Sequence, residues 1–263
     1  MRSYLTLLAL LTALPLCAQN MIVNSSLMRG TVTSVQGDCP APVWEMVLAA
    51  GSSTYIGSDG SGTITLTGAT LAEDPTSSGI YSIDMDGVDD RWEGGTGIDN
   101  IHAGAGFSVE FWLRPDIDQA ASIFGKIVLG ASTYSWRLGQ SSASDLIFLN
   151  VENTSGAPDT FGSPVDSIDA FVGQTTYLHV MAKVSGCTGM ACTDAQIYFN
   201  GSPVTTTQLA NNTGTLRDDS TFTLRGGLLG NDTNDFDGRM SGVKIYGAAV
   251  TDGCAASRFA AGR

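Results

Sequence analysis

The chain has 263 residues, 26 of them acidic and 13 basic, which gives a formal net charge of −13 at pH 7. A surface this acidic repels nucleic acids and anionic membranes, so we expect neither as a partner. The length suits a single domain if the chain folds as a β-sandwich, a class that commonly reaches this size in one unit.

Residues 1–18 are predicted to be a secretory signal peptide. A positively charged Arg2 precedes the apolar stretch YLTLLALLTALPL, which is too short to span a bilayer. Leu16 and Ala18 fit a signal-peptidase site, so the mature protein is expected to begin at Gln19. The cysteine between them also allows a lipoprotein, but the leucine stands where a small residue is normally required. Since no later stretch is apolar enough for a transmembrane segment, we expect a secreted or cell-surface-associated protein.

Residues 19–38 precede the first cysteine of the mature chain and are its least defined region. They could form a mobile leader, a first edge strand, or an arm that pairs with a neighbouring subunit. We expect residues 39–263 to form one domain.

Alternation with a period of two marks the predicted strands. In FSVEFWLR (107–114) the apolar residues fall on one face, and Ser, Glu, Trp and Arg fall on the other. The segment AQIYFNG (195–201) ends in an Asn-Gly pair, which predicts a hairpin into SPVTTTQ. Helical periodicity is weak after the signal peptide, and GCAASRFAAG (253–262) is expected to form no more than one short turn. Further predicted strands are TITLTG (63–68), SDLIFLNV (144–151), TYLHVMAKV (176–184), STFTLRG (220–226) and GVKIYGAAV (242–250). The sequence therefore predicts an all-β protein.

Four cysteines remain after removal of the signal peptide, and an even number in an exported chain indicates two disulfides with three possible pairings. Cys187–Cys192 is the favoured local bridge, because a short run of turn-forming residues separates the two. Cys39 then pairs with Cys254. A zinc site is a weaker alternative, because the chain has only two histidines and the cysteine spacing fits no common zinc pattern.

Five segments in order carry a resemblance to a known family. They are IDMDGVDDRW (83–92), FSVEFWLRPD (107–116), TTYLHVMAKVSG (175–186), AQIYFNGSPV (195–204) and FDGRMSGVKIYGAAVTDG (236–253). Together they resemble the laminin-G-like and pentraxin-like jelly roll of the concanavalin A-like lectin/glucanase superfamily. The resemblance implies a sandwich of two antiparallel sheets with adjacent terminal strands. A Cys39–Cys254 bridge needs that adjacency, because its Cα atoms must lie within about 7 Å of each other.

The stretch YSIDMDGVDDRWEGG (81–95) places Asp84 and Asp86 on one face of a predicted strand, as an active site or a calcium site would need. By resemblance such a segment ends a strand, and Asp and Gly favour tight turns, so a polar turn at the sandwich rim is the preferred interpretation. His179 matches a strand position where the family often has histidine, which favours a structural role.

Catalysis is not expected. By resemblance, glucanases of this fold carry two glutamates and an aspartate spaced E-x-D-x-x-E, which supply the two carboxylates of a retaining glycosidase. This chain has five glutamates, and no two of them lie within five residues of each other. A glycoside hydrolase is therefore only a distant third hypothesis.

Calcium is the candidate cofactor. The loop GNDTNDFDG (230–238) lies about where pentraxin-like proteins place an acidic metal-binding loop, and it offers the oxygen ligands that calcium prefers. The family's second contribution would come from LGASTYS (129–135), which has no carboxylate here, so a solvated acidic turn is the alternative. The candidate ligands are Asn231, Asp232, Asn234, Asp235 and Asp237.

Trp92 and Trp136 fall near predicted strand ends, where the rim loops of a jelly roll meet ligands. Together with Arg91 they are the candidate sugar-binding residues, because an aromatic ring offers a stacking surface. Trp112 lies on the face opposite the apolar one, but the family places tryptophan there as part of its packing, so a core role is preferred.

The leading hypothesis is an exported, non-catalytic lectin-like or adhesion domain that binds a glycan or another surface polymer, with calcium as a possible aid. It rests on the resemblance, since a fold alone does not fix a function. The alternative is a structural subunit of an extracellular assembly, such as a surface layer or a filament, whose partners are copies of itself. Residues 19–38 separate the two, because order gained only through a neighbouring chain favours assembly.

Overall fold

The computed structural model describes residues 39–57, 60–75, 77–95, 98–99, 101, 104–128, 133–187, 192–211, 214–227 and 235–263. The predicted signal peptide (1–18) and the segment 19–38 lie outside the described residues. So do Asn231, Asp232 and Asn234 of the predicted calcium loop. Among the residues described, no helix is both long enough and apolar enough to cross a membrane.

Among the described residues, ten strands form the first sheet, here called sheet A. Its main path runs β15-β14-β13-β8-β18-β1-β2-β3, while β6 pairs with both β18 and β5 beside that path. The strands are β1 (Trp44–Ala49), β2 (Ser52–Gly57), β3 (Gly60–Thr63), β5 (Thr70–Glu73), β6 (Tyr81–Asp86), β8 (Gly106–Pro115), β13 (Leu178–Ser185), β14 (Asp194–Phe199), β15 (Ser202–Val204) and β18 (Asp237–Tyr246).

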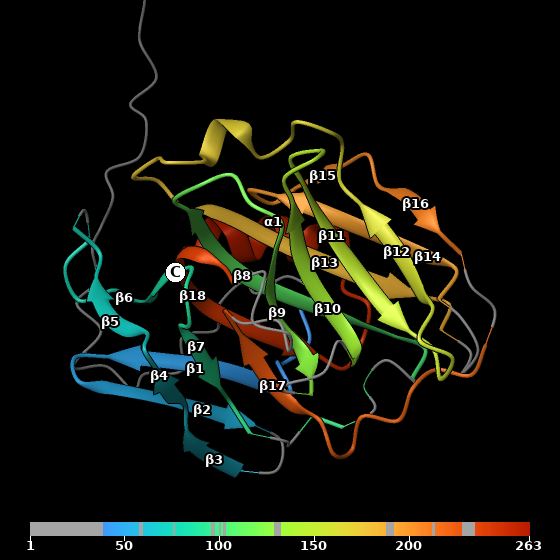
Figure 1. Ribbon diagram of the computed structural model, residues 1–263, viewed down its shortest axis with the longest axis horizontal. Coiled ribbons are helices and arrows are strands. Elements are labelled where there is room, and N and C mark those ends of the chain that lie inside the picture. Colours follow the sequence, from blue (N-terminus) through green and yellow to red (C-terminus); the bar gives the residue numbers. More distant parts are fainter. Residues whose placement is uncertain are drawn as a thin grey trace, which may run out of the picture. The chain divides into compact units, whose positions relative to one another are not determined.

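The second sheet, sheet B, has eight strands in the part of the chain that the structure describes, in the order β16-β12-β11-β10-β9-β17-β7-β4. The strands are β4 (Thr65–Thr67), β7 (Arg91–Glu93), β9 (Ala121–Ile127), β10 (Tyr134–Ser141), β11 (Leu146–Glu152), β12 (Pro158–Gly162), β16 (Thr207–Ala210) and β17 (Thr223–Gly226). A 3-10 helix, η2 (Asp169–Phe171), lies between β12 and β13 in the chain. In Figure 1, β9 to β12 lie in front of β8, β13 and β14, so the two sheets face each other. The strand pairings are antiparallel in both sheets, which confirms the predicted all-β sandwich.

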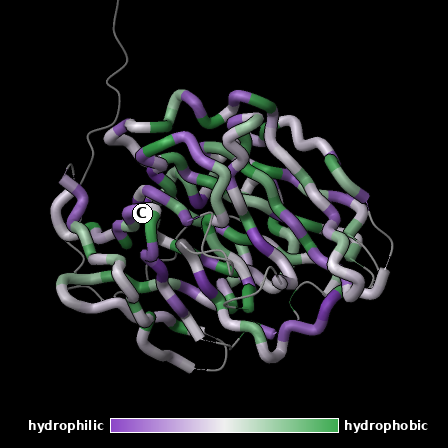
Figure 2. Tube along the Cα trace, viewed as in Figure 1, coloured by the Kyte–Doolittle hydropathy of each residue, from purple (hydrophilic) through white to green (hydrophobic). Residues whose placement is uncertain are grey.

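The core lies between the two sheets. Strand β8 supplies Phe107, Val109, Phe111 and Leu113, all at 0% exposure, so the predicted inward face of this strand is confirmed. Across the sandwich the ring of Phe111 meets that of Phe124 from β9 at 5.1 Å between centroids, edge to face. Figure 2 shows hydrophobic stretches recurring along the strands of the sandwich, as burial on one face of each strand requires.

Helix α1 (Asp252–Ala261) covers part of the outer face of sheet A. The sequence predicted no more than one short turn here, and this prediction was wrong, because the helix has ten residues. Thr251 caps its start by accepting a hydrogen bond from the backbone of Cys254 at 3.2 Å. Cys254 and Ala255 are buried together with Tyr198 of sheet A. A helix of this length is not stable alone in water and is stabilised here by packing on the sheet. The helix propensities of its residues do not reveal that packing, which is why the sequence did not predict the helix.

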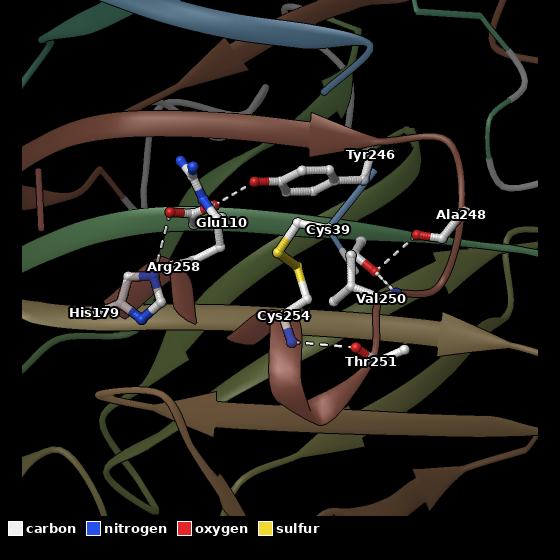
Figure 3. Close-up of a disulfide and its surroundings, with 10 residues drawn as sticks. Cys39, Glu110, His179, Tyr246, Ala248, Val250, Thr251, Cys254 and Arg258 are labelled. Carbon is white, nitrogen blue, oxygen red and sulfur yellow. Dashed lines mark hydrogen bonds and ion pairs between the residues drawn. A yellow bond between two sulfur atoms is a disulfide. The ribbon is translucent and has the colours of Figure 1, made fainter. Parts of the chain in front are cut away.

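Both predicted disulfides are present. The Cα atoms of Cys187 and Cys192 lie 4.0 Å apart, and those of Cys39 and Cys254 lie 4.9 Å apart. The long bridge joins the segment ahead of β1 to helix α1, whereas the resemblance implied a bridge between the two terminal strands. Figure 3 shows this bridge between α1 and the strands of sheet A.

Candidate functional site

The sugar-binding role predicted for Trp92 and Trp136 is contradicted by their burial. Both side chains have 0% exposure. Trp92 stacks on Trp44 with 6.1 Å between ring centroids, inside the sandwich. Its neighbours Arg91 and Glu93 point outward from β7 and pair with each other at 3.3 Å. Successive side chains of a strand point to opposite faces, so Trp92, which lies between the two outward residues of β7, points into the core. The face of its ring is therefore not accessible to a sugar.

Trp112 and His179 occupy the outer face of sheet A beneath α1. Their rings lie 4.8 Å apart, and the ring of Phe259 from α1 lies 5.9 Å from Trp112. Trp112 is 8% exposed and His179 is 0% exposed, so both have the structural role that was preferred for them. The packing of Trp112, however, is against the helix and not between the sheets.

Glu110 is the centre of a buried polar cluster under the same helix. Its carboxylate accepts hydrogen bonds from the Tyr246 hydroxyl at 2.5 Å and from Nε of Arg258 at 2.9 Å, and it lies 3.4 Å from Nε2 of His179 (Figure 3). Burial by itself would raise the pKa of Glu110. The hydrogen bond with His179, the charge of Lys244 and the bonds from the other two partners outweigh burial and lower the pKa to about 2. This cluster fastens α1 to the sheet, and the Glu110 and His179 side chains have no exposed surface.

The polar turn predicted after Asp86 is confirmed. The Asp86 side chain accepts a hydrogen bond from the backbone of Val88 at 3.0 Å, and Asp90 accepts one from the backbone of Asp86 at 2.8 Å. Gly87 has φ = 72°, and a Cβ at this position would lie 2.7 Å from the Cβ of Asp237. The turn therefore needs glycine both for its backbone conformation and for the close approach of β18.

The same turn lines an acidic hollow at the rim of sheet A. Asp86 stands directly opposite Asp237, because β6 pairs with β18, so two acidic segments far apart in the sequence meet. The hollow measures about 390 Å³. Its acidic lining residues are Asp84, Asp86, Asp90, Asp116 and Asp237. Asp84 pairs with Arg239 and Asp116 pairs with Arg114, each at 3.0 Å, which leaves Asp86, Asp90 and Asp237 as the acidic group facing the hollow without such a pair among the described residues.

Charge repulsion is concentrated in the acidic hollow. Burial raises the pKa of Asp237, and the carboxylates of Asp116, Asp86 and Asp84 raise it further. Burial also raises the pKa of Asp90, against the hydrogen bond from Asp86. A cation in this hollow would relieve the repulsion. Of the five predicted calcium ligands, Asp237 lines the hollow and Asp235 is a buried residue two positions before it.

A second candidate lies on the outer face of sheet B, which the sequence analysis did not single out. The pairing of neighbouring strands places one residue from each strand side by side in a row across sheet B. This row, here called the polar row, consists of Glu93, Arg225, Gly125, Arg137, Asn150 and Thr160. The signal in the sequence was the strand LIFLNVE (146–152), where Ile147, Leu149 and Val151 face inward. The alternation therefore places Phe148, an aromatic ring, on the polar side with Asn150.

A hollow of about 200 Å³ opens on this face, here called the sheet B hollow. Phe148 and Leu209 form apolar walls, and Asn150, Thr160, Ser141 and Ser144 contribute polar groups. A Cβ at Gly139 would lie 2.3 Å from the Phe148 ring, so the glycine lets this ring lie across β10.

Asn150 is the polar group best prepared for a ligand in this hollow. It is 4% exposed, and its Nδ2 donates to the Tyr134 hydroxyl at 3.2 Å. Its Oδ1 is buried and has no hydrogen-bond partner among the residues described. Such an acceptor costs about 1–3 kcal/mol when it is left unpaired, so a ligand donor would recover free energy there.

Arg137 stands beside this hollow, directly opposite Asn150 in the register. Its guanidinium lies 4.3 Å from the centre of the Tyr134 ring and 5.5 Å from that of Phe148. One of its terminal nitrogens donates to the Ser122 hydroxyl at 3.3 Å. The two rings and this hydrogen bond hold the guanidinium in one place.

Solved structures with a similar fold include binding domains. The receptor-binding domain of botulinum neurotoxin type G has a TM-score of 0.61 and 10% identity, over 84% of this chain and 51% of that one. The binding domain of Paraclostridial mosquitocidal protein 1 has a TM-score of 0.58 and 14% identity, over 83% and 51%. The ligand-binding domain of botulinum neurotoxin serotype D, in complex with N-acetylneuraminic acid, has a TM-score of 0.60 and 10% identity, over 84% and 51%. This chain thus spans about half the length of each, and at these identities the likeness shows the fold.

Among curated proteins no sequence match was found. A laminin G-like family model, described as the concanavalin A-like lectin/glucanases superfamily, matches residues 94–253. That range contains β8 to β18 and thus the central strands of both sheets. The chain therefore belongs to the concanavalin A-like lectin/glucanase superfamily.

Proposed function

We propose that the chain is an exported, non-catalytic lectin-like or adhesion module that binds a glycan in the sheet B hollow. The observation that carries the proposal is the pairing of a ring and a free acceptor in one hollow, the Phe148 side chain and Oδ1 of Asn150. Sugar rings pack their C–H faces on aromatic side chains, and their hydroxyl groups donate to such acceptors.

The structural neighbours support a binding role. One of them is a receptor-binding domain, and another is a ligand-binding domain in complex with N-acetylneuraminic acid. Since this chain spans about half of each, the place of that ligand is not carried over. Absence of catalysis is supported by the spacing of the glutamates and by the engagement of Glu110 in the cluster under α1.

Export is supported by the two disulfides, which persist in oxidising compartments outside the cytosol. The signal peptide predicted at residues 1–18 would direct it. Sequencing the N-terminus of the protein recovered from the culture medium tests both, with Gln19 as the expected first residue.

Calcium binding at the acidic hollow is the second part of the proposal. The donor set fits a hard cation, because Asp86, Asp90 and Asp237 offer carboxylate oxygens that repel one another. Asp89 adds to this set, since one carboxylate oxygen each from Asp86, Asp89 and Asp90 lie within 4.8 Å of one another. Calcium held there would order the rim turn.

A glycan array probed with the purified protein, with and without calcium, tests the glycan proposal. We expect a hit that weakens about tenfold in Asn150→Ala and in Phe148→Ala, since each loses roughly 1.4 kcal/mol of contact. Thr65→Ala is the matched control, because Thr65 lies at the far end of the polar row, on β4 opposite Glu93, and is exposed.

Two outcomes contradict the glycan proposal. Binding that is unaffected by both hollow variants would place the ligand elsewhere on the protein. A protein that binds no glycan but elutes as large, regular assemblies would favour the structural subunit of an extracellular layer or filament.

A further inference from the structure

We propose that the ligand of the sheet B hollow is an acidic sugar, carrying a carboxylate or a sulfate, and that Arg137 selects it. This inference rests on the proposed glycan-binding function and adds the chemical class of the ligand. The observation behind it is an imbalance of charge pairing around Arg137.

The described part of the chain contains eleven lysines and arginines, and ten of them have a carboxylate within 4.0 Å. Arg137 is the exception among these described residues. In a chain with twice as many acids as bases, a cation without a carboxylate partner is unexpected. The nearby Glu152 is held by Arg217 at 2.9 Å, and burial raises its pKa. Arg137 therefore keeps donors for an external anion.

Arg137 is also preorganised for that anion. The ring centres of Tyr134 and Phe148 lie 4.3 and 5.5 Å from its guanidinium, and the side chain is half-buried. A fixed guanidinium loses less entropy on binding than a mobile lysine would, and its planar fork matches the two oxygens of a carboxylate.

The backbone around Arg137 keeps the approach open. Its cross-strand neighbour on β9 is Gly125, where a Cβ would lie 2.8 Å from the Cβ of Arg137. Its neighbour on β11 is Asn150, which faces the sheet B hollow. A sugar in the hollow can thus bind Asn150 through a hydroxyl group and Arg137 through an acidic substituent.

The opposite end of the hollow fixes the expected orientation. Ser144, which lines the hollow, accepts a hydrogen bond from the backbone of Asp166, and the carboxylates of Asp145, Asp166 and Asp169 gather there. An anionic substituent is repelled at this end and attracted at the Arg137 end. The two ends of the hollow therefore discriminate the two directions of one sugar.

The test compares one neutral oligosaccharide, a galactose-terminated trisaccharide, with the same oligosaccharide bearing glucuronic acid, N-acetylneuraminic acid or a sulfate ester. Titration calorimetry on the purified protein gives each affinity. We expect the acidic forms to bind about tenfold to a hundredfold more tightly than the neutral form, as a hydrogen-bonded charge pair allows. The two carboxylate forms and the sulfate form show which anion the site prefers.

Variants of Arg137 assign the preference. Arg137→Gln is expected to remove the preference, so that acidic and neutral forms bind with equal affinity, while Arg137→Lys is expected to retain part of it. Arg225→Gln is the matched control, because Arg225 lies on the same polar row but is paired with Glu93 at 3.1 Å. Thermal melting of each variant separates a folding defect from a loss of contact.

The outcomes separate this inference from the function on which it rests. Equal affinity for neutral and acidic forms, or a preference that survives in Arg137→Gln, would overturn the inference and leave glycan binding standing. Failure of every form to bind, or binding insensitive to Asn150→Ala, would overturn the proposed function and this inference with it.

Discussion

Glu110 of β8 and Arg258 of α1 form an ion pair of 2.9 Å in which the carboxylate side chain has no exposed surface. The pair joins the central strand of sheet A to the C-terminal helix, which the Cys39–Cys254 bridge also ties to the start of the domain. Helix α1 is thus held to sheet A by an ionic contact and to the segment ahead of β1 by a covalent one.

The pH dependence of stability should show the ionic contact. The pKa of Glu110 is lowered in the folded state to about 2, from 4.5, so folding favours the charged form. Its stabilisation is therefore complete above pH 4.5 and is lost as the pH falls towards 2, with a magnitude on the order of 3 kcal/mol. Urea unfolding measured between pH 2 and pH 7 should show this loss, and Glu110→Gln should flatten it.

A matched control for Glu110 is available on the same sheet. Glu45 pairs with Lys244 at 3.4 Å, but its side chain is 37% exposed. Glu45→Gln should change the free energy of unfolding by less than about 1 kcal/mol. An unchanged profile in Glu110→Gln would show that other carboxylates cause the acid sensitivity.

The two disulfides should contribute unequally. Cys39 and Cys254 are 215 residues apart, so on the chain-entropy model their bridge stabilises the fold by about 5 kcal/mol, against about 2 kcal/mol for Cys187–Cys192. Replacing each pair by serine and comparing denaturant midpoints measures the two terms. A larger loss from the short bridge would mean that it fixes its loop by packing, and the entropic account would be wrong.

Much of the fold was predictable because its signals are local. The strand FSVEFWLR (107–114) alternates cleanly, the Asn-Gly pair at 200–201 forms the expected hairpin, and the cysteine count indicated both bridges. Helix α1 was not predicted, because its stability depends on sheet A and on Cys254, which are remote in the sequence.

The candidate site was less predictable, because it depends on register. Asp86 meets Asp237 only through the pairing of β6 with β18, and Arg137 meets Asn150 only through that of β10 with β11. Trp92 was misassigned, since a tryptophan beside charged residues fits a rim site and a core strand equally well in sequence. Its stacking on Trp44 decides between them.

Trp92 should therefore matter for stability. Trp92→Ala removes a fully buried indole from the stack with Trp44 and is expected to destabilise the domain by about 3–5 kcal/mol. Val88→Ala, at a residue that is 69% exposed on the neighbouring turn, should change stability by less than about 0.5 kcal/mol. A stable Trp92→Ala protein with weakened glycan binding would restore the binding role predicted from the sequence.

Gly139 should matter for binding through Phe148. A methyl group at this position would lie 2.3 Å from the Phe148 ring and 2.8 Å from the Ala121 carbonyl oxygen, so the ring must move. We expect Gly139→Ala to cost about 1–3 kcal/mol of stability and to weaken glycan binding to the extent seen in Phe148→Ala. The double variant should bind no more weakly than either single one, and additive losses would show that Gly139 acts on the ligand by another route.

Calcium should act through the acidic hollow in the opposite pH sense to Glu110. Because burial and neighbouring carboxylates raise the pKa of Asp237, its charged form is disfavoured by folding. The charged carboxylate therefore lowers the stability of the fold above its folded pKa and ceases to do so as the pH falls.

At neutral pH a cation relieves the same repulsion. At ten times its dissociation constant calcium would stabilise the fold by about 1.4 kcal/mol, which corresponds to a rise of a few degrees in Tm. Asp237→Asn should raise Tm without calcium and abolish the response, whereas Asp194→Asn, outside the hollow, should keep it. An equal rise with magnesium, or a response that survives in Asp237→Asn, would mean that the cation screens the acidic surface as a whole.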